Sequence, residues 1–155
     1  MKTLVLGIGN TLLTDEGAGV HVIRQLQREN VIPSHVELMD GGTLSFTLAG
    51  PIEDADCLIV IDAAELEDEP GTVKTFLGKD MDTFLGANRK LSVHEVGLLD
   101  LMAVAHLAGH LPRRRALIGI QPNVVGWGEA PSAEVAAAIP HACNVAMDLI
   151  GEWQA

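Results

Sequence analysis

Short apolar runs alternate along this chain with longer stretches in which apolar residues recur at helical spacing. Three runs, at 2–8, 57–61 and 116–120, are almost continuously apolar, which is typical of strands covered on both faces. A shorter run at 35–39 predicts a further strand. A more polar run at 72–77 predicts an additional strand, at an edge of the sheet.

Helical patterns fall between these strands, at residues 15–29, 44–49, 96–110 and 132–152. Gly50 and Pro51 are expected to end the second of these helices. Ser132 is the predicted N-cap of the last one. Pro140 is expected to kink or restart that helix, because proline supplies no backbone N–H.

Strands that alternate with helices predict a three-layer α/β sheet, and we expect one domain spanning 1–155. In such sheets, sites form where loops leave the carboxyl ends of the strands. The segments just past the buried strands are 7–10, 40–43, Asp62 and 121–122. We therefore expect functional residues among them.

The composition narrows the choice of partners. Because 21 acidic residues face 10 basic ones, the net charge is −11, which opposes binding to nucleic acid and to anionic membrane surfaces. Aromatic residues make up only 3 %, with no Tyr, so the chain offers little for base stacking. A partner with a basic segment, or a cation, suits this surface.

The two cysteines, Cys57 and Cys143, stand in apolar runs without CxxC spacing. We expect both to be free and buried, with a raised thiol pKa that makes them poor nucleophiles. The apolar segment at the N-terminus is too short for a signal peptide or a membrane span. We therefore expect a cytoplasmic protein.

The glycines after the first strand raise the possibility of a dinucleotide-binding loop. Gly7 and Gly9 begin a G-x-G pattern, and Asp40 ends the second strand, where a ribose-binding acid would lie. However, Leu12 stands where the third glycine belongs. The next helix also opens with acidic residues, which repel a pyrophosphate. This alternative is weak but stays open.

Other hydrolase motifs are incomplete. His106 and His110 lie four residues apart in a predicted helix, but Leu107 stands where a zincin needs Glu, so a structural or surface role is expected. The chain has no G-x-S-x-G elbow, and its serines occupy turn or cap positions. The run Pro-Arg-Arg-Arg at 112–115 is most simply a solvated charged turn.

Glu16, Asp62 and His94 are the strongest candidates for a functional set. Each has an ordinary explanation alone: Glu16 favours the helix dipole, Asp62 ends a strand, and His94 precedes a helix. Together, two carboxylates and an imidazole make a mixed oxygen and nitrogen ligand set that suits nickel, zinc or cadmium.

Several segments, in order along nearly the whole chain, resemble the maturation endopeptidases of nickel–iron hydrogenases. They are LVLGIGNTLLTDEGAGV, which starts at Leu4, DGGT at 40–43, LIVIDA at 58–63, SVHEVGLLD at 92–100, and GIQP at 119–122 with the later WGEAPSAEV. A single G-x-G-N would be unspecific, whereas these blocks in order are specific.

The resemblance implies an α/β/α fold with a twisted, mainly parallel five-stranded sheet. It also implies an endopeptidase, sometimes classed with the aspartic-type peptidases, that removes the C-terminal extension of a nickel-loaded hydrogenase large-subunit precursor. Nickel is then supplied by the substrate, and cadmium or zinc can substitute in the isolated protein. The expected partner is that precursor, and the enzyme itself is expected to be a monomer.

The resemblance also assigns roles to particular residues. The family's metal-contacting Glu, Asp and His fall on Glu16, Asp62 and His94, and its Asp in the D-G-G loop, linked to catalysis or substrate reading, falls on Asp40. A metal beside the scissile bond can polarise the carbonyl, and a carboxylate can act as general base. Asp40, Glu16 and Asp62 are the candidates for that base. A non-catalytic nickel carrier is the alternative function that uses the same residues.

Overall fold

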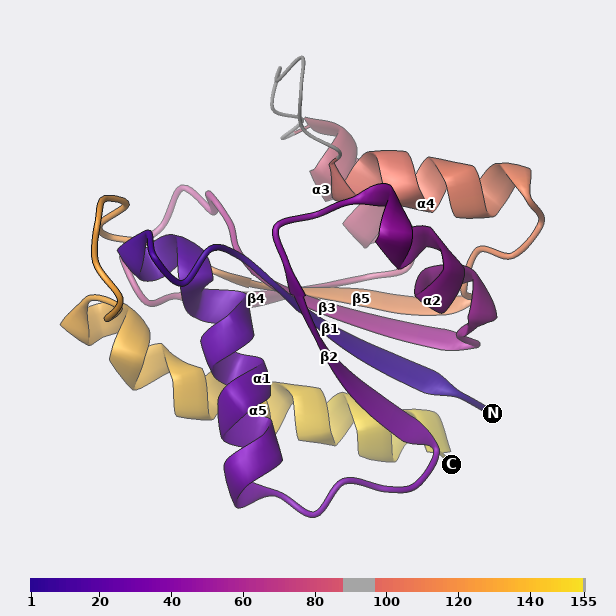
Figure 1. Cartoon of the computed structure of the whole chain (residues 1–155), viewed down its shortest axis with the longest axis horizontal. Coiled ribbons are helices and arrows are strands. Elements are labelled where there is room, and N and C mark those ends of the chain that lie inside the picture. The colour runs from indigo at the N-terminus through magenta and orange to yellow at the C-terminus, as the bar shows by residue number, and fades with distance from the viewer. Residues whose placement is uncertain (88–96, 155) are drawn as a thin grey trace.

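The computed structural model describes residues 1–87 and 97–154, and its centre is a five-stranded sheet (Figure 1). The strands are β1 (Thr3–Ile8), β2 (Val36–Gly42), β3 (Cys57–Ala63), β4 (Val73–Leu77) and β5 (Arg114–Ile120). Their order is β2-β1-β3-β5-β4, and all neighbours are parallel except β4, which runs antiparallel to β5. The predicted strands are therefore confirmed, including the edge position of the polar one.

Helices cover both faces of this sheet, which confirms the three-layer prediction. The 3-10 turns are η1 (Thr14–Gly17) and η2 (Phe46–Leu48), and the helices are α1 (Ala18–Glu29), α2 (Ala49–Asp54), α3 (Lys79–Ala87), α4 (Leu98–Leu107) and α5 (Ala133–Gln154). Helices α1 and α5 lie on one face, and α2, α3 and α4 on the other (Figure 1). Within the described part of the chain, no helix combines the length and apolarity that crossing a bilayer requires.

Alternation of side chains along β3 divides the core between the two faces. Ile59 and Ile61 pack with α1 and α5, whereas Leu58 and Val60 pack with α2, α3 and α4. All four are fully buried, which is why the strand reads as a continuous apolar run. By the same alternation, Asp62 lies on the face of Leu58 and Val60.

Two helices differ from the prediction at prolines. The helix expected to stop at Gly50 and Pro51 instead continues as α2 to Asp54. Pro51 lies in the first turn, where backbone N–H groups have no partner inside the helix, so its missing N–H is tolerated. Pro140 lies inside α5 without restarting it. Both Pro140 and Ala136 are exposed, so water can reach the Ala136 carbonyl that lacks a helical donor.

The sequence pattern does not indicate α3, and it misplaces part of the arginine run. Helix α3 fully buries only Met81, so its apolar periodicity is weak. Asp82 of α3 accepts hydrogen bonds from Arg115 Nε at 3.0 Å and Nη2 at 2.5 Å. Arg115 belongs to β5, and its side chain is mostly buried. The prediction of a solvated turn is therefore wrong for this residue, because its partner comes from a distant helix.

The order of the strands reverses between β1 and β3. From β1 the chain passes to β2 on one side, and then crosses back to β3 on the other side of β1. In open α/β sheets, the crevice at the carboxyl ends of such a strand pair is the usual ligand site. The loop after β1 and the end of β3 meet at this position.

Candidate active site

Glu16 lies in η1, at the end of the loop that leaves β1. Its Oε2 accepts a hydrogen bond from the Asn10 N–H at 3.0 Å, and its own N–H donates to the Leu13 carbonyl at 3.1 Å. Asn10 Oδ1 in turn accepts from the Leu12 N–H at 2.9 Å. The loop thus fixes the half-buried Glu16 side chain at the carboxyl edge of the sheet.

Two glycines allow this loop and α1 to approach the strand ends closely. A β-carbon at Gly19 would overlap the carbonyl oxygens of Ile61 and Ile8, near the ends of β3 and β1. A β-carbon at Gly9 would overlap the Glu16 carbonyl oxygen, and Gly9 has a φ of 142°. Only glycine fits these positions, so the location of Glu16 depends on them.

The backbone of the same loop argues against dinucleotide binding. A phosphate-binding loop presents its N–H groups to the ligand. Here the N–H groups of Gly9, Asn10 and the segment 12–16 all donate to oxygen atoms of the protein itself. The glycines of this loop therefore serve close packing rather than recognition of a pyrophosphate.

Asp62 lies inside β3, where it pairs in register with Gly119 of β5, and not in a loop after the strand as expected. Turn η1, which carries Glu16, packs against β3. The third predicted metal contact, His94, falls outside the described residues. Among the residues that are described, no group of three or more His, Cys, Asp or Glu side chains could hold a metal ion. Glu16 and Asp62 thus come from neighbouring strand ends, and the three-residue set stays a prediction.

Asp40 lies at a β-bulge. Gly7 of β1 pairs with Asp40, but the following Ile8 pairs with Gly42, so Gly41 is an extra residue in β2. Asp40 Oδ1 accepts a hydrogen bond from the Gly42 N–H at 2.9 Å. Strand β2 therefore extends past its predicted end at 39. Bulges of this kind redirect side chains beside active sites.

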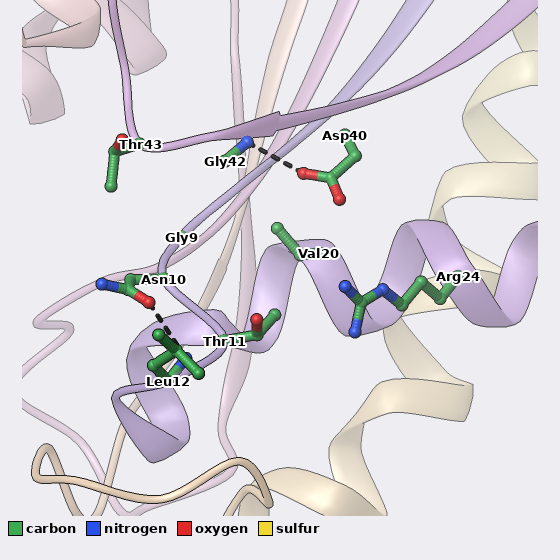
Figure 2. Close-up of a pocket in the computed structure, with 9 residues that line it drawn as sticks. All are labelled: Gly9, Asn10, Thr11, Leu12, Val20, Arg24, Asp40, Gly42 and Thr43. Carbon is green, nitrogen blue, oxygen red and sulfur yellow. Dashed lines mark hydrogen bonds between the residues drawn. The ribbon is translucent and has the colours of Figure 1, made fainter.

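Asp40 borders a surface pocket of about 340 Å³. Arg24 of α1 lies on the facing side of this pocket (Figure 2). The other lining residues come from α1 and the loops after β1 and β2: Gly9, Asn10, Thr11, Leu12, Val20, Gly42 and Thr43. Glu16 and Asp62 are not part of its lining. The pocket is large enough for a substrate side chain, and it adjoins the loop that holds Glu16.

Asp15 has a role that its position at a helix start does not reveal. This residue is 0 % exposed. Its Oδ2 accepts hydrogen bonds from the N–H groups of Asn123 and Val124, both at 2.8 Å, and from Ser132 Oγ at 2.8 Å. Its Oδ1 accepts from the Ser132 N–H at 2.6 Å. Burial raises the pKa of this carboxyl, but the hydrogen bonds together outweigh burial and hold the pKa below its usual value.

Thr14 connects the same two loops a second time. Its N–H donates to the Gly128 carbonyl at 2.8 Å, and its hydroxyl donates to the Val124 carbonyl at 2.6 Å. The hydroxyl also accepts from the Gly126 N–H at 3.1 Å. Thr14 has a φ of 50°, a conformation that threonine rarely adopts and that these contacts stabilise. The loops 9–17 and 121–132 are thus bonded into one unit beside Glu16.

The remaining chemical motifs lie apart from this site. Helix α4 ends at Leu107 and Gly109 turns the chain with a φ of 77°, so His106 and His110 do not share a helix face as expected. Both histidines are exposed. Cys57 and Cys143 are free and buried, as predicted, and burial raises the pKa of Cys143 to about 11.

These features define a doubly wound α/β protein with acidic side chains at the switch point of its sheet. Residues 20–149 match the hydrogenase maturation protease family, and the chain belongs to that family. The resemblance noted in the sequence is thereby confirmed, as is the assignment to the peptide-bond hydrolases.

Individual relatives agree with this assignment. The hydrogenase expression/formation protein HupD of Rhodobacter capsulatus is 39 % identical over 153 residues, which cover 98 % of this chain and 72 % of HupD. The hydrogenase maturating endopeptidase HybD from E. coli aligns with a TM-score of 0.90 at 31 % identity, covering 98 % of this chain and 93 % of HybD. The [NiFe] hydrogenase maturation protease HybD from Thermococcus kodakarensis gives a TM-score of 0.79 at 30 % identity, covering 96 % and 99 %.

Proposed function

We propose that this protein is the endopeptidase that removes the C-terminal extension of a hydrogenase large-subunit precursor once that precursor carries nickel. Membership of the hydrogenase maturation protease family supports the reaction. The observation that carries the proposal is the origin of Glu16 and Asp62 at neighbouring strand ends, where an open α/β sheet binds its ligand.

In this proposal, Glu16, Asp62 and His94 contact the nickel of the substrate. Carboxylate oxygens and an imidazole nitrogen are suitable ligands for a divalent transition metal. Because the metal arrives with the precursor, these side chains complete its coordination from the enzyme side and thereby locate the scissile bond. Three ligands leave coordination positions open, so the isolated enzyme should bind cadmium, zinc or nickel only modestly.

The hydrolysis itself needs a base for the attacking water. The water oxygen attacks the carbonyl carbon, and a carboxylate accepts the water proton and passes it to the nitrogen of the leaving peptide. Asp40, Glu16 and Asp62 are the candidates for this base. Asp40 borders the pocket opposite Arg24, which supports a further part for it in reading the substrate.

Mass spectrometry of the purified precursor, before and after incubation with this protein, tests the proposal. The nickel-loaded precursor should lose its C-terminal extension, and the nickel-free precursor should stay intact. Equal cleavage of both forms would contradict nickel sensing. An unchanged mass of the loaded precursor would favour the alternative function, a non-catalytic nickel carrier that uses the same residues.

Substitutions at the three proposed contacts extend this test. Glu16→Gln, Asp62→Asn and His94→Ala should each abolish processing or slow it severely, with an unchanged circular dichroism spectrum. Glutamine keeps an oxygen that can accept the Asn10 N–H, so the loop should survive the change at Glu16. Glu152→Gln, at an exposed position of α5, is the matched control and should process normally.

A further inference from the structure

Four large apolar side chains are exposed on the two bonded loops beside Glu16. They are Leu12, Val124, Val125 and Trp127, which we call the apolar rim. Trp127 is 87 % exposed and Val125 is 59 % exposed. Single exposed apolar residues are ordinary, but a cluster of this kind that includes a tryptophan is typical of an interaction site.

The backbone under the apolar rim is held in place by hydrogen bonds. The Gly128 N–H donates to the Leu12 carbonyl at 2.9 Å, and Leu13 and Gly128 form a β-bridge. The carboxylate of Asp15 binds the Val124 N–H from below. A surface whose backbone is already ordered loses little conformational entropy on binding, so its apolar contacts contribute more fully to affinity.

The apolar rim is continuous with the candidate active site. Leu12 belongs to the rim and also lines the pocket that Asp40 borders. Leu12 and Glu16 lie in one hydrogen-bonded loop. A polypeptide that reaches Glu16 and Asp40 therefore passes beside the rim.

We infer that the apolar rim docks the hydrogenase large-subunit precursor, through an apolar surface next to the C-terminal extension that is cleaved. This inference rests on the proposed function, and it adds the part of the enzyme that holds the substrate during the reaction. Tryptophan at the centre of a docking surface typically carries much of the binding energy.

The charge around the apolar rim favours the precursor over a second copy of this chain. Glu129 follows the rim directly, and the exposed Glu134 accepts a hydrogen bond from Asn123 Nδ2 at 3.3 Å. With a net charge of −11, two copies that met rim to rim would bring like charges together. The complementary partner has an apolar centre flanked by basic residues.

The test compares Trp127→Ala with the wild-type enzyme on the purified nickel-loaded precursor. Two quantities are measured: the Kd by biolayer interferometry with immobilised enzyme, and the processing rate as a function of precursor concentration. Loss of a central tryptophan should raise both Kd and KM by roughly 30-fold. The kcat should stay within twofold, since Trp127 is not part of the proposed metal contact or base.

Matched controls separate the apolar rim from exposed apolar residues in general. Leu107→Ala removes an 86 % exposed side chain at the end of α4, away from the rim, and should leave Kd and KM unchanged. Val125→Ser should weaken binding, whereas Val31→Ser, at a 93 % exposed position after α1, should not. Equal effects of the paired substitutions would overturn the inference.

Each outcome decides between docking and cleavage separately. If Trp127→Ala leaves Kd within threefold of wild type, the docking inference is wrong, whether or not the wild type cleaves. If the wild type binds but does not cleave, and Trp127→Ala weakens binding, docking stands and the proposed function fails. A wild type that does not bind the precursor overturns docking. A wild-type dimer that Trp127→Ala dissociates, with Kd unchanged, shows that the rim binds a second copy instead.

Discussion

Replacing Asp15 by Asn should destabilise the protein substantially, although the two side chains have the same size. The carboxylate accepts hydrogen bonds from the N–H groups of Asn123, Val124 and Ser132 and from the Ser132 hydroxyl. An asparagine presents one oxygen and one NH₂ group. With its oxygen at the Oδ2 position it keeps three of these donors, but its NH₂ group then faces the Ser132 N–H.

The magnitude follows from these contacts. The three remaining hydrogen bonds lose the assistance of the negative charge, which roughly halves the strength of each. The Ser132 N–H loses its acceptor and faces another donor, which costs about 1–3 kcal/mol. Since residues 123 and 124 are exposed, water relieves part of the loss, and we expect a decrease of about 3 kcal/mol in the free energy of unfolding.

The pH dependence of this decrease has a definite sign. The folded state holds the pKa of Asp15 below its usual value, so the carboxylate stabilises the fold at pH values above the pKa of an unfolded Asp. That stabilisation is lost as the pH falls through the folded pKa. The difference between wild type and Asp15→Asn should be constant from pH 7 to about pH 5, and shrink below about pH 4.

Urea denaturation followed by circular dichroism measures both effects. Asp148→Asn, at an exposed position of α5, is the control and should change the free energy of unfolding by less than about 0.5 kcal/mol. A decrease of less than about 1 kcal/mol for Asp15→Asn at pH 7 would refute the account of this buried carboxylate. So would a difference that widens below pH 4.

Three further predictions concern other parts of the molecule. Asp40→Asn should slow processing while the rise in Tm on adding cadmium stays as in wild type; equal loss of both would assign Asp40 to the metal site instead. Gly19→Ala should lower the stability by roughly 1–3 kcal/mol because its β-carbon overlaps two strand-end carbonyl oxygens, whereas Gly151→Ala in α5, with open space around it, should be neutral or stabilising in thermal unfolding. Joint replacement of His106 and His110 by Ala should leave processing and Tm unchanged, and lost activity would show that this exposed pair matters.

The strands are readable from the sequence because burial on both faces of β3 and its neighbours selects for continuous apolar runs. The local pattern fails where tertiary contacts decide. Helix α3 buries only Met81 fully, so the sequence shows little periodicity there. Pro51 reads as a stop because its place in the first turn of α2 depends on where η2 ends.

The site shows the same division between local and distant information. Glu16, Asp62 and Asp40 were found because they lie at the carboxyl ends of strands, and that rule needs only the order of elements. The role of Asp15 could not be found in this way, because its partners Asn123 and Ser132 lie 108 and 117 residues further along the chain. A buried acid at a helix start reads the same in the sequence as an exposed one.

The two loops that Asp15 connects carry two proposed parts of the enzyme, and kinetics can separate them. Glu16, which we propose contacts the nickel, follows Asp15 directly, and the apolar rim includes Val124, whose N–H binds the Asp15 carboxylate. Glu16→Gln should therefore lower kcat with little change in KM, and Trp127→Ala should raise KM with little change in kcat. Asp15→Asn, measured at a temperature where it stays folded, should change both, because it loosens the loops together. A normal kcat and KM in a folded Asp15→Asn enzyme would show that this buried carboxylate serves stability alone.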